Sequence, residues 1–236
     1  MWNAMADALE VNASAQRATR MRGLYAITPD TPDASATARL CEMVDAALAG
    51  GASVLQYRNK MAAPELRRVQ AYTLAALCAR RGAAFIVNDH LELACQIGGA
   101  GLHVGVEDFN DLATVRRALG PHRMLGVSCY ASLARAREAV AAGADYVAFG
   151  SVFASRSKSA ALRAPLELFR EARELGVPLV GIGGITVENL PQLIAAGADA
   201  AAVIDGLFGV DDVRERACQL LRCFDRLEQR CPHEIP

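Results

Sequence analysis

The sequence predicts a single (β/α)8 TIM barrel of the α/β class, and three observations support this fold. Eight short apolar runs alternate with eight amphipathic helical runs along the chain. Three stretches repeat one pattern of helix, Ala-Gly and apolar strand: DAALAGGASVLQY, EAVAAGADYVAFG and QLIAAGADAAAVI. The length of 236 residues suits one barrel built from eight such units. An open, doubly wound parallel sheet is the alternative.

The expected elements follow from hydrophobic periodicity and from glycine and proline signals. The expected strands cover residues 23–28, 53–57, 84–88, 102–104, 124–128, 146–149, 178–182 and 200–204. The expected helices cover residues 36–49, 64–81, 91–97, 110–119, 132–142, 165–175, 187–196 and 211–229. The glycine after each repeated helix suits a left-handed helix end. In such a barrel, the residues that follow each strand gather at one mouth.

Composition and charge are those of an ordinary globular protein. Hydrophobic residues make up 53% of the chain, and 25 basic residues against 26 acidic ones give a net charge of −1. We therefore expect small-molecule substrates and no nucleic-acid partner. We expect no membrane association, because no apolar stretch approaches the ~20 residues of a membrane span. The sequence leaves the oligomeric state open, a homo-oligomer included.

The seven cysteines are scattered, and none forms a C-x-x-C pair. An odd, dispersed set is typical of small core residues in a reducing compartment, so we expect a cytoplasmic protein.

The ends of the chain differ from its middle. The first residues are rich in alanine, carry acidic residues as well as arginines, and lack the apolar core of a secretory signal. We expect a helical or disordered extension over residues 1–22, the catalytic barrel over 23–230 and a frayed tail over 231–236. Met21 directly precedes the first strand and is a second candidate for the start of the chain.

The stretch LQYRNK, at the end of the second expected strand, is the centre of the candidate site. Side chains alternate between the two faces of a strand, so Gln56, Arg58 and Lys60 point the same way as Val54. Because buried charge without a partner is costly, the two cations need a carboxylate of the protein or an anionic ligand.

Carboxylates follow the third and fourth expected strands, which end in NDH and GVED. Neighbouring strands would place Asp89 and Asp108 at the same mouth. Simple ion pairing with the cations is one interpretation. The other is a Mg²⁺ site, because Mg²⁺ binds one or two carboxylates together with substrate phosphates and water.

Ser128 ends the fifth expected strand. None of the histidines (His90, His103, His122 and His233) is expected beside it, so we interpret Ser128 as a hydrogen-bonding residue and reject a nucleophilic serine. The histidines also lack metal-ligand spacing. We expect His103 within a strand and the others at the surface, and we assign none of them a role.

Two further stretches suit phosphate binding. The loop after the sixth strand, residues 150–164, is either a flexible polar loop or a lid whose hydroxyls and cations face the mouth. The GIGG turn after the seventh strand and the turn after the eighth let backbone N–H groups approach an anion closely. Barrels frequently bind phosphate at these two turns.

Taken together, these stretches resemble the thiamine-phosphate synthase family. The matching phrases run in order over residues 23–207: GLYAIT, LQYRNK, FIVNDH, GLHVGVED, LGVSCY, YVAFGSVFASRSK, VGIGGIT and GADAAAVI. The resemblance implies a transferase of thiamine biosynthesis. The family joins hydroxymethylpyrimidine diphosphate to hydroxyethylthiazole phosphate, releasing diphosphate in a dissociative, Mg²⁺-assisted substitution.

The resemblance also implies a role for each residue at the mouth. The pyrimidine diphosphate would be held by Gln56, Tyr57, Arg58, Asn59, Lys60, Asn88, Ser128 and Lys158. The thiazole phosphate would be held by Ser155, Arg156, Ser157, Gly184, Ile204 and Asp205. One Mg²⁺ would be bound by Asp89 and Asp108. The expected catalytic residues are Arg58, Lys60, Ser128 and Lys158.

The chain departs from the family at several positions. Val106, Ala154 and Asp205 stand where the family usually has glutamine, proline and serine, and Ser155 and Ser157 replace threonines while keeping the hydroxyl groups. A carboxylate at position 205 repels a phosphate unless it points away.

Three other functions compete with the synthase. A thiazole tautomerase on the same fold would need no diphosphate metal site, and that branch typically lacks the Asn-Asp and Glu-Asp strand ends seen here. A non-enzymatic binder of thiazole phosphate would not need Arg58, Lys60 and Lys158. A phosphate-sugar isomerase would need an acid–base pair across the mouth, which the sequence does not offer.

Overall fold

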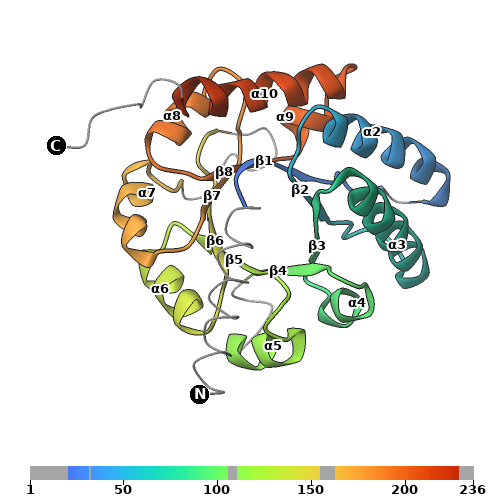
Figure 1. Cartoon of the computed structure of the whole chain (residues 1–236), viewed down its shortest axis with the longest axis horizontal. Helices are drawn as coiled ribbons and strands as arrows, with labels where there is room; N and C mark the ends of the chain where they lie inside the picture. Colours follow the sequence, from blue (N-terminus) through green and yellow to red (C-terminus); the bar gives the residue numbers. More distant parts are fainter. Residues whose placement is uncertain (1–20, 32, 106–110, 155–162, 229–236) are drawn as a thin grey trace, which may run out of the picture.

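The computed structural model describes residues 21–31, 33–105, 111–154 and 163–228. Eight parallel strands follow one another around a closed barrel, and the last strand pairs with the first. Helices form a ring outside the strands (Figure 1). The (β/α)8 prediction is therefore confirmed. The alternative of an open sheet is wrong, because β1 and β8 are hydrogen-bonded to each other.

The elements agree closely with those expected from the sequence. The strands are β1 Gly23–Ile27, β2 Val54–Tyr57, β3 Ala84–Asn88, β4 Gly101–Gly105, β5 Leu125–Tyr130, β6 Tyr146–Gly150, β7 Leu179–Ile182 and β8 Ala200–Val203. The helices are α2 Thr37–Ala49, α3 Pro64–Arg81, α4 Leu91–Gln96, α5 Leu112–Leu119, α6 Leu133–Ala141, α7 Glu167–Glu171, α8 Leu190–Ala195, α9 Asp205–Phe208 and α10 Val213–Glu228.

Two short 3-10 turns complete the fold, η1 Ala34–Ala36 and η2 Ala172–Leu175. The helix expected over 165–175 is divided between α7 and η2. The one-turn helix α9, directly after β8, was not predicted from the sequence. A short extra helix at this place is common in barrels that bind phosphate.

The repeated Ala-Gly phrase ends three helices as expected. Gly51, Gly143 and Gly197 have φ angles of 103°, 95° and 109°, in the left-handed region that favours glycine. Each glycine reverses the chain at the amino end of the barrel, so that the next strand begins in register beside its neighbour.

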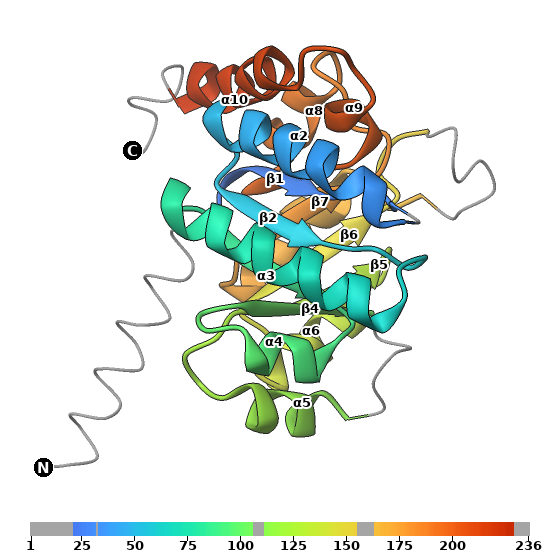
Figure 2. The same cartoon turned by 90° about the vertical axis from the view of Figure 1, so that its right-hand side faces the viewer.

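The core has two layers. The larger layer lies between the strands and the surrounding helices. The smaller layer fills the barrel interior, where Met21, Tyr25, Val54 and Tyr146 pack together. Val54 and Gln56 both point inward, so the prediction that they share one face of the strand is confirmed. Polar groups of Tyr25, Gln56, His103 and Tyr146 also lie in this interior and are hydrogen-bonded to one another. Figure 2 shows β2 pointing along the barrel toward the carboxyl end.

Within the described part of the chain, no helix is both long enough and apolar enough to cross a bilayer.

Gly126 of β5 makes room for Tyr146, one of the two tyrosines of the interior layer. A Cβ atom at this position would lie 1.9 Å from Cζ of Tyr146, well inside van der Waals contact. Any other residue at position 126 would therefore displace the Tyr146 ring.

We predict that Gly126→Ala lowers the free energy of unfolding by about 3 kcal/mol, because the added methyl group overpacks the interior. Urea unfolding monitored by circular dichroism measures the change. Gly98→Ala is the matched control, since nothing lies within 4 Å of a Cβ atom there and the residue is not in the left-handed region. Equal stabilities of the two variants would contradict the packing argument.

Candidate active site

The end of β2 carries the two cations expected from the sequence. Arg58 Nη1 lies 3.1 Å from Oδ2 of Asp30, and the other carboxylate oxygen of Asp30 accepts the backbone N–H of Lys60 at 2.7 Å. Thr28 fixes the backbone further, because its hydroxyl accepts from Arg58 N and donates to Arg58 O. The protein carboxylate that balances Arg58 is therefore Asp30, which the sequence analysis missed.

Lys60 contributes the second positive charge at this corner. Its side chain is exposed, and among the described residues no carboxylate forms an ion pair with it. Among the described residues, one cation of the pair is thus balanced by a carboxylate and the other is not.

Tyr57 and Asn59 turn away from the barrel axis. Tyr57 belongs to the outer core layer, and its hydroxyl donates to Gln70 Oε1 at 2.8 Å. Asn59 is buried, donates to Thr31 and Gln70, and accepts from the backbone N–H groups of the following turn. Both side chains hold the loop that follows β2. Their role in substrate binding stays a prediction.

The end of β3 presents a carboxylate from an unusual backbone conformation. Asp89 has a φ angle of 61°, a left-handed conformation that few residues other than glycine, asparagine and aspartate adopt. Its backbone N–H donates to His103 O at 2.9 Å, and its carboxylate accepts from the amide of Asn88. Such strain is concentrated at functional sites, and here it fixes where the carboxylate lies.

Ser128, near the end of β5, has a histidine neighbour that was not expected from the sequence. His103 Nε2 lies 2.9 Å from Ser128 Oγ, so the expectation that no histidine stands beside Ser128 is wrong. His103 pairs with Gly126 in the sheet and points into the barrel, where its other nitrogen lies 3.0 Å from the Tyr146 hydroxyl. Strand alternation could have revealed this orientation, because Leu102 and Val104 on either side face the helices.

His103 is nevertheless poorly suited to activate a serine. Burial lowers its pKa to about 4, because the interior disfavours the charged imidazolium. A base with so low a pKa takes a proton from a hydroxyl group with difficulty at neutral pH. Ser128 and His103 are therefore better described as neutral hydrogen-bonding groups.

The loops after β6 and β7 pack closely against each other. Gly183 and Gly184 both have positive φ angles, and a Cβ atom on Gly184 would lie 2.4 Å from the backbone oxygen of Ala154. Phe153 N donates to Gly183 O at 3.0 Å. The side chain of Asn189 closes the turn, accepting from Thr186 N and donating to Gly184 O. The glycines expected to bind phosphate therefore also permit this loop contact.

The turn after β8 leads directly into α9. Ile204 is the residue before this helix and Asp205 is its first residue. A Cβ atom on Gly206 would lie 2.4 Å from Ile185 O, so the turns after β7 and β8 touch. The structure therefore brings Gly184, Ile204 and Asp205 to one side of the mouth.

Several predicted site residues lie outside the described part of the chain. They are Asp108, Ser155, Arg156, Ser157 and Lys158, together with the departure at Val106. Their expected roles stay predictions.

The described half of the expected metal site suits Mg²⁺ by the chemistry of its donors. Asp89 offers a hard carboxylate oxygen at the mouth, and Mg²⁺ typically binds one or two carboxylates together with phosphate oxygens and water. Within the described ranges, no group of three or more histidine, cysteine, aspartate or glutamate side chains could hold a metal by itself. A metal here would depend on Asp89, on Asp108 and on its substrate.

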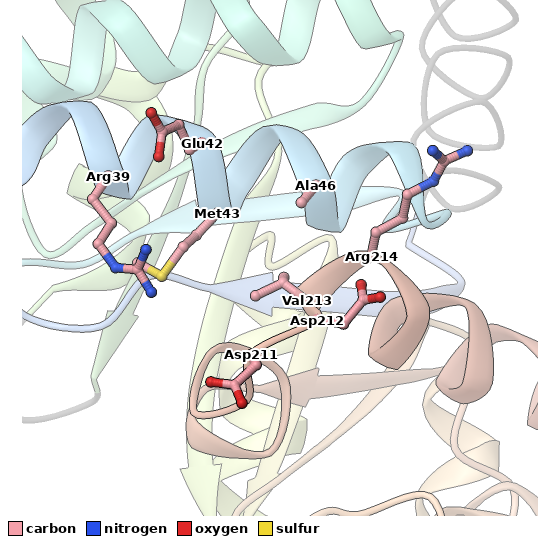
Figure 3. A pocket seen from close by; sticks show the side chains of 8 residues that line it. All are labelled: Arg39, Glu42, Met43, Ala46, Asp211, Asp212, Val213 and Arg214. Carbon is pink, nitrogen blue, oxygen red and sulfur yellow. The ribbon is translucent and has the colours of Figure 1, made fainter.

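A groove on the outer surface lies apart from the mouth. Figure 3 shows it between α2 and the segment leading into α10, with side chains of both signs of charge around it. Its volume is about 400 Å³, and it is lined by Arg39, Glu42, Met43, Ala46, Asp211, Asp212, Val213 and Arg214. None of these residues belongs to the expected site.

The fold defines a class of protein: a closed (β/α)8 barrel, in which functional residues gather where the strands end. The comparisons with known proteins narrow this class. The model of the thiamine monophosphate synthase family matches residues 24–207, which is most of the chain. The chain therefore belongs to this family and is an enzyme of the transferase kind.

Curated relatives agree over nearly their whole length. The thiamine-phosphate synthase of Aromatoleum aromaticum is 54% identical over 208 residues, which cover 88% of this chain and 98% of that protein. The thiamine-phosphate synthase of Chromobacterium violaceum is 51% identical over 205 residues, covering 87% and 97%. Among solved structures, the thiamine phosphate pyrophosphorylase of Pyrococcus furiosus superposes with a TM-score of 0.77 at 31% identity, covering 88% of this chain and 97% of that one.

We predict that His103 makes the protein less stable in mild acid. An unfolded histidine titrates near pH 6.5, whereas folded His103 titrates near 4. Because the folded pKa is the lower one, the unfolded state binds the extra proton between these values, and the free energy of unfolding falls as the pH drops. The expected loss between pH 7 and pH 4 is about 3 kcal/mol.

Urea unfolding of the wild type and of His103→Gln at both pH values measures this effect. Carboxylates titrate in both proteins, so the stability difference between them isolates His103. As the pH falls, the free energy of unfolding of His103→Gln should rise relative to that of the wild type. A difference that is the same at both pH values would show that His103 is not buried in its neutral form.

Proposed function

We propose that this protein is a thiamine-phosphate synthase that condenses 4-amino-2-methyl-5-(diphosphooxymethyl)pyrimidine with 4-methyl-5-(2-phosphooxyethyl)thiazole. The products would be thiamine phosphate and diphosphate, within thiamine biosynthesis. The observation that carries this proposal is the identity of about half of all positions with synthases that match over nearly their full length. The free cysteines of the described residues are consistent with a cytoplasmic enzyme.

The end of β2 would bind the leaving diphosphate. Arg58 and Lys60 both follow the end of β2. Their positive charges would stabilise the negative charge that grows as the carbon–oxygen bond breaks. Asp30 holds Arg58 and the backbone of Lys60 in place before the substrate arrives. Such a fixed arrangement needs little reorganisation during the reaction. Lys158, from the loop after β6, would add a third cation.

Gln56, Asn88 and Ser128 would orient the pyrimidine diphosphate. They lie toward the carboxyl ends of three different strands, β2, β3 and β5, so they approach the mouth from different sides. Positioning matters here because the thiazole nitrogen must meet the reacting carbon before water does.

The opposite side of the mouth would hold the thiazole phosphate. Backbone N–H groups near Gly184, Ile204 and Asp205 offer donors that need no side-chain charge. The hydroxyl groups of Ser155 and Ser157 would complete this subsite. Because Asp205 is exposed and opens α9, its carboxylate can point to solvent while its backbone faces the phosphate.

Mg²⁺ held by Asp89 and Asp108 would supply positive charge to the leaving diphosphate. The described part of the chain offers no strong base or nucleophile at the mouth, since the pKa of His103 is lowered to about 4. A dissociative substitution needs neither group, because diphosphate leaves before the thiazole nitrogen attacks. This agreement supports the synthase over a tautomerase, which must move protons.

A coupling assay tests the proposal directly. The protein is mixed with both substrates, with and without Mg²⁺, and thiamine phosphate is followed by its fluorescent oxidation product. We expect product only when Mg²⁺ is present. An absence of product, with thiazole phosphate still bound in calorimetry, would overturn the proposal in favour of a tautomerase or a binder.

We predict that Asp89→Asn lowers kcat/KM at saturating Mg²⁺ at least about a hundredfold, because a neutral amide is a weak ligand for Mg²⁺. Asparagine tolerates the left-handed conformation as well as aspartate does, so the backbone should be unchanged. Steady-state kinetics over a Mg²⁺ titration measure the effect.

Glu92→Gln is the matched control for this variant. It makes the same carboxylate-to-amide change on an exposed residue of α4, next to the mouth loop. Its kinetics should equal those of the wild type. Wild-type turnover by Asp89→Asn would refute the metal assignment.

A further inference from the structure

A continuous chain of hydrogen bonds crosses the barrel interior. Gln56 Nε2 donates to the Tyr25 hydroxyl at 2.7 Å, and the hydroxyl oxygens of Tyr25 and Tyr146 lie 2.8 Å apart. Tyr146 OH lies 3.0 Å from His103 Nδ1, and His103 Nε2 lies 2.9 Å from Ser128 Oγ. The five side chains come from β2, β1, β6, β4 and β5.

The residues in the middle of this series of hydrogen bonds are closed to solvent. Tyr25 is 1% exposed, Tyr146 is fully buried and His103 is 8% exposed. Buried hydroxyl groups must find their partners within the protein. For Tyr25 and Tyr146 the partners found in the described ranges are their two neighbours along these hydrogen bonds, so each hydroxyl should donate one hydrogen bond and accept another.

This requirement makes the chain directional. A neutral histidine has a single N–H group, on one nitrogen or the other. If Gln56 donates to Tyr25, then Tyr25 donates to Tyr146, and Tyr146 donates to His103 Nδ1. The imidazole proton then sits on Nε2 and is donated to Ser128. Reversing one of these bonds alone would require a tyrosine hydroxyl to donate twice or accept twice, or the imidazole to carry two protons or none, so a polar atom would lose its partner.

The hydrogen-bonding roles of Gln56 and Ser128, at the two ends of this series of hydrogen bonds, are therefore determined together. Because the amide N–H of Gln56 donates to Tyr25, its carbonyl oxygen remains to accept a hydrogen bond in the site. With its oxygen accepting from His103, Ser128 keeps its own proton for the site. This is the opposite of the order in a nucleophilic serine, which donates its proton to the histidine.

We propose that Tyr25, Tyr146 and His103 form an ordered relay that makes Gln56 a hydrogen-bond acceptor and Ser128 a hydrogen-bond donor toward the bound substrate. The three relay residues are positioning residues and do not touch the substrate. The inference rests on the proposed function, in which the substrate is an aminopyrimidine diphosphate. Its exocyclic amine supplies a donor for Gln56, and its diphosphate oxygens supply acceptors for Ser128.

The packing of the interior supports a fixed relay. The rings of His103 and Tyr146 stack with centroids 5.6 Å apart, and those of Tyr25 and Tyr146 meet edge to face at 6.1 Å. The absence of a side chain at Gly126 gives Tyr146 its place. The rings therefore cannot turn to other partners without displacing the sheet.

The first test reads the order of the relay in the wild-type protein. Nitrogen-15 NMR of the imidazole distinguishes the two neutral tautomers, and the His103 signals are identified by their loss in His103→Gln. We expect the Nε2–H tautomer at pH 7.5. The Nδ1–H tautomer would overturn the proposal, and it would do so whether or not the protein couples the two substrates.

The second test reads the coupling through substrate binding. Tyr146→Phe keeps the ring and removes the central hydroxyl, so Tyr25 loses its acceptor and can turn its proton toward Gln56. We expect KM for the pyrimidine diphosphate to rise about tenfold, the effect of roughly one lost hydrogen bond. KM for the thiazole phosphate should stay within about twofold, since it does not meet Gln56.

Tyr25→Phe and the double variant make this test specific. Tyr25→Phe should raise KM for the pyrimidine diphosphate by the same factor. The double variant Tyr25→Phe/Tyr146→Phe should raise it no further, because either substitution alone already interrupts the relay. Tyr72→Phe, on the exposed face of α3, is the control and should leave both KM values unchanged. Additive effects of the two substitutions, or equal changes in both KM values, would overturn the relay. Urea unfolding checks that each variant is folded.

Discussion

The geometry of the mouth depends on hydrogen bonds made below it, inside the barrel. A barrel of eight parallel strands usually fills its interior with branched apolar side chains. Here tyrosine, histidine and glutamine take part of that space, and each must satisfy its polar atoms without water. Gly126 makes this arrangement possible, because any side chain there would meet the ring of Tyr146. Fixing these groups also fixes Gln56 and Ser128, which reach the mouth from β2 and β5.

The charged groups at the mouth are also held by contacts within the protein. Asp30 binds Arg58 and the backbone of Lys60, so contacts within the protein hold the loop that carries the two cations. Asp89 is held in a strained conformation by a neighbouring strand, since its N–H group donates to the backbone of His103. A site prepared in this way suits a reaction whose main requirement is the stabilisation of a leaving anion.

The sequence predicted the fold well because its signals are local and repeated. Apolar strands and glycine-capped helices recur in the same order, and strand alternation correctly placed Gln56 on the same face as Val54. The partners of these residues were harder to predict, because they come from other strands. Asp30 follows β1, but nothing in its own neighbourhood indicates that it binds Arg58. His103 looked like an isolated strand residue, and only the parallel register brings it beside Ser128 and Tyr146. The helix α9 was missed because four residues carry no periodicity.

The most direct test of this account is a crystal structure of the protein with Mg²⁺ and inorganic diphosphate, the anionic product of the proposed reaction. We expect diphosphate at the ends of β2 and β3, contacted by Arg58 and Lys60, with the metal bound to Asp89. Diphosphate in the outer groove between α2 and α10, or a metal bound away from Asp89, would contradict it.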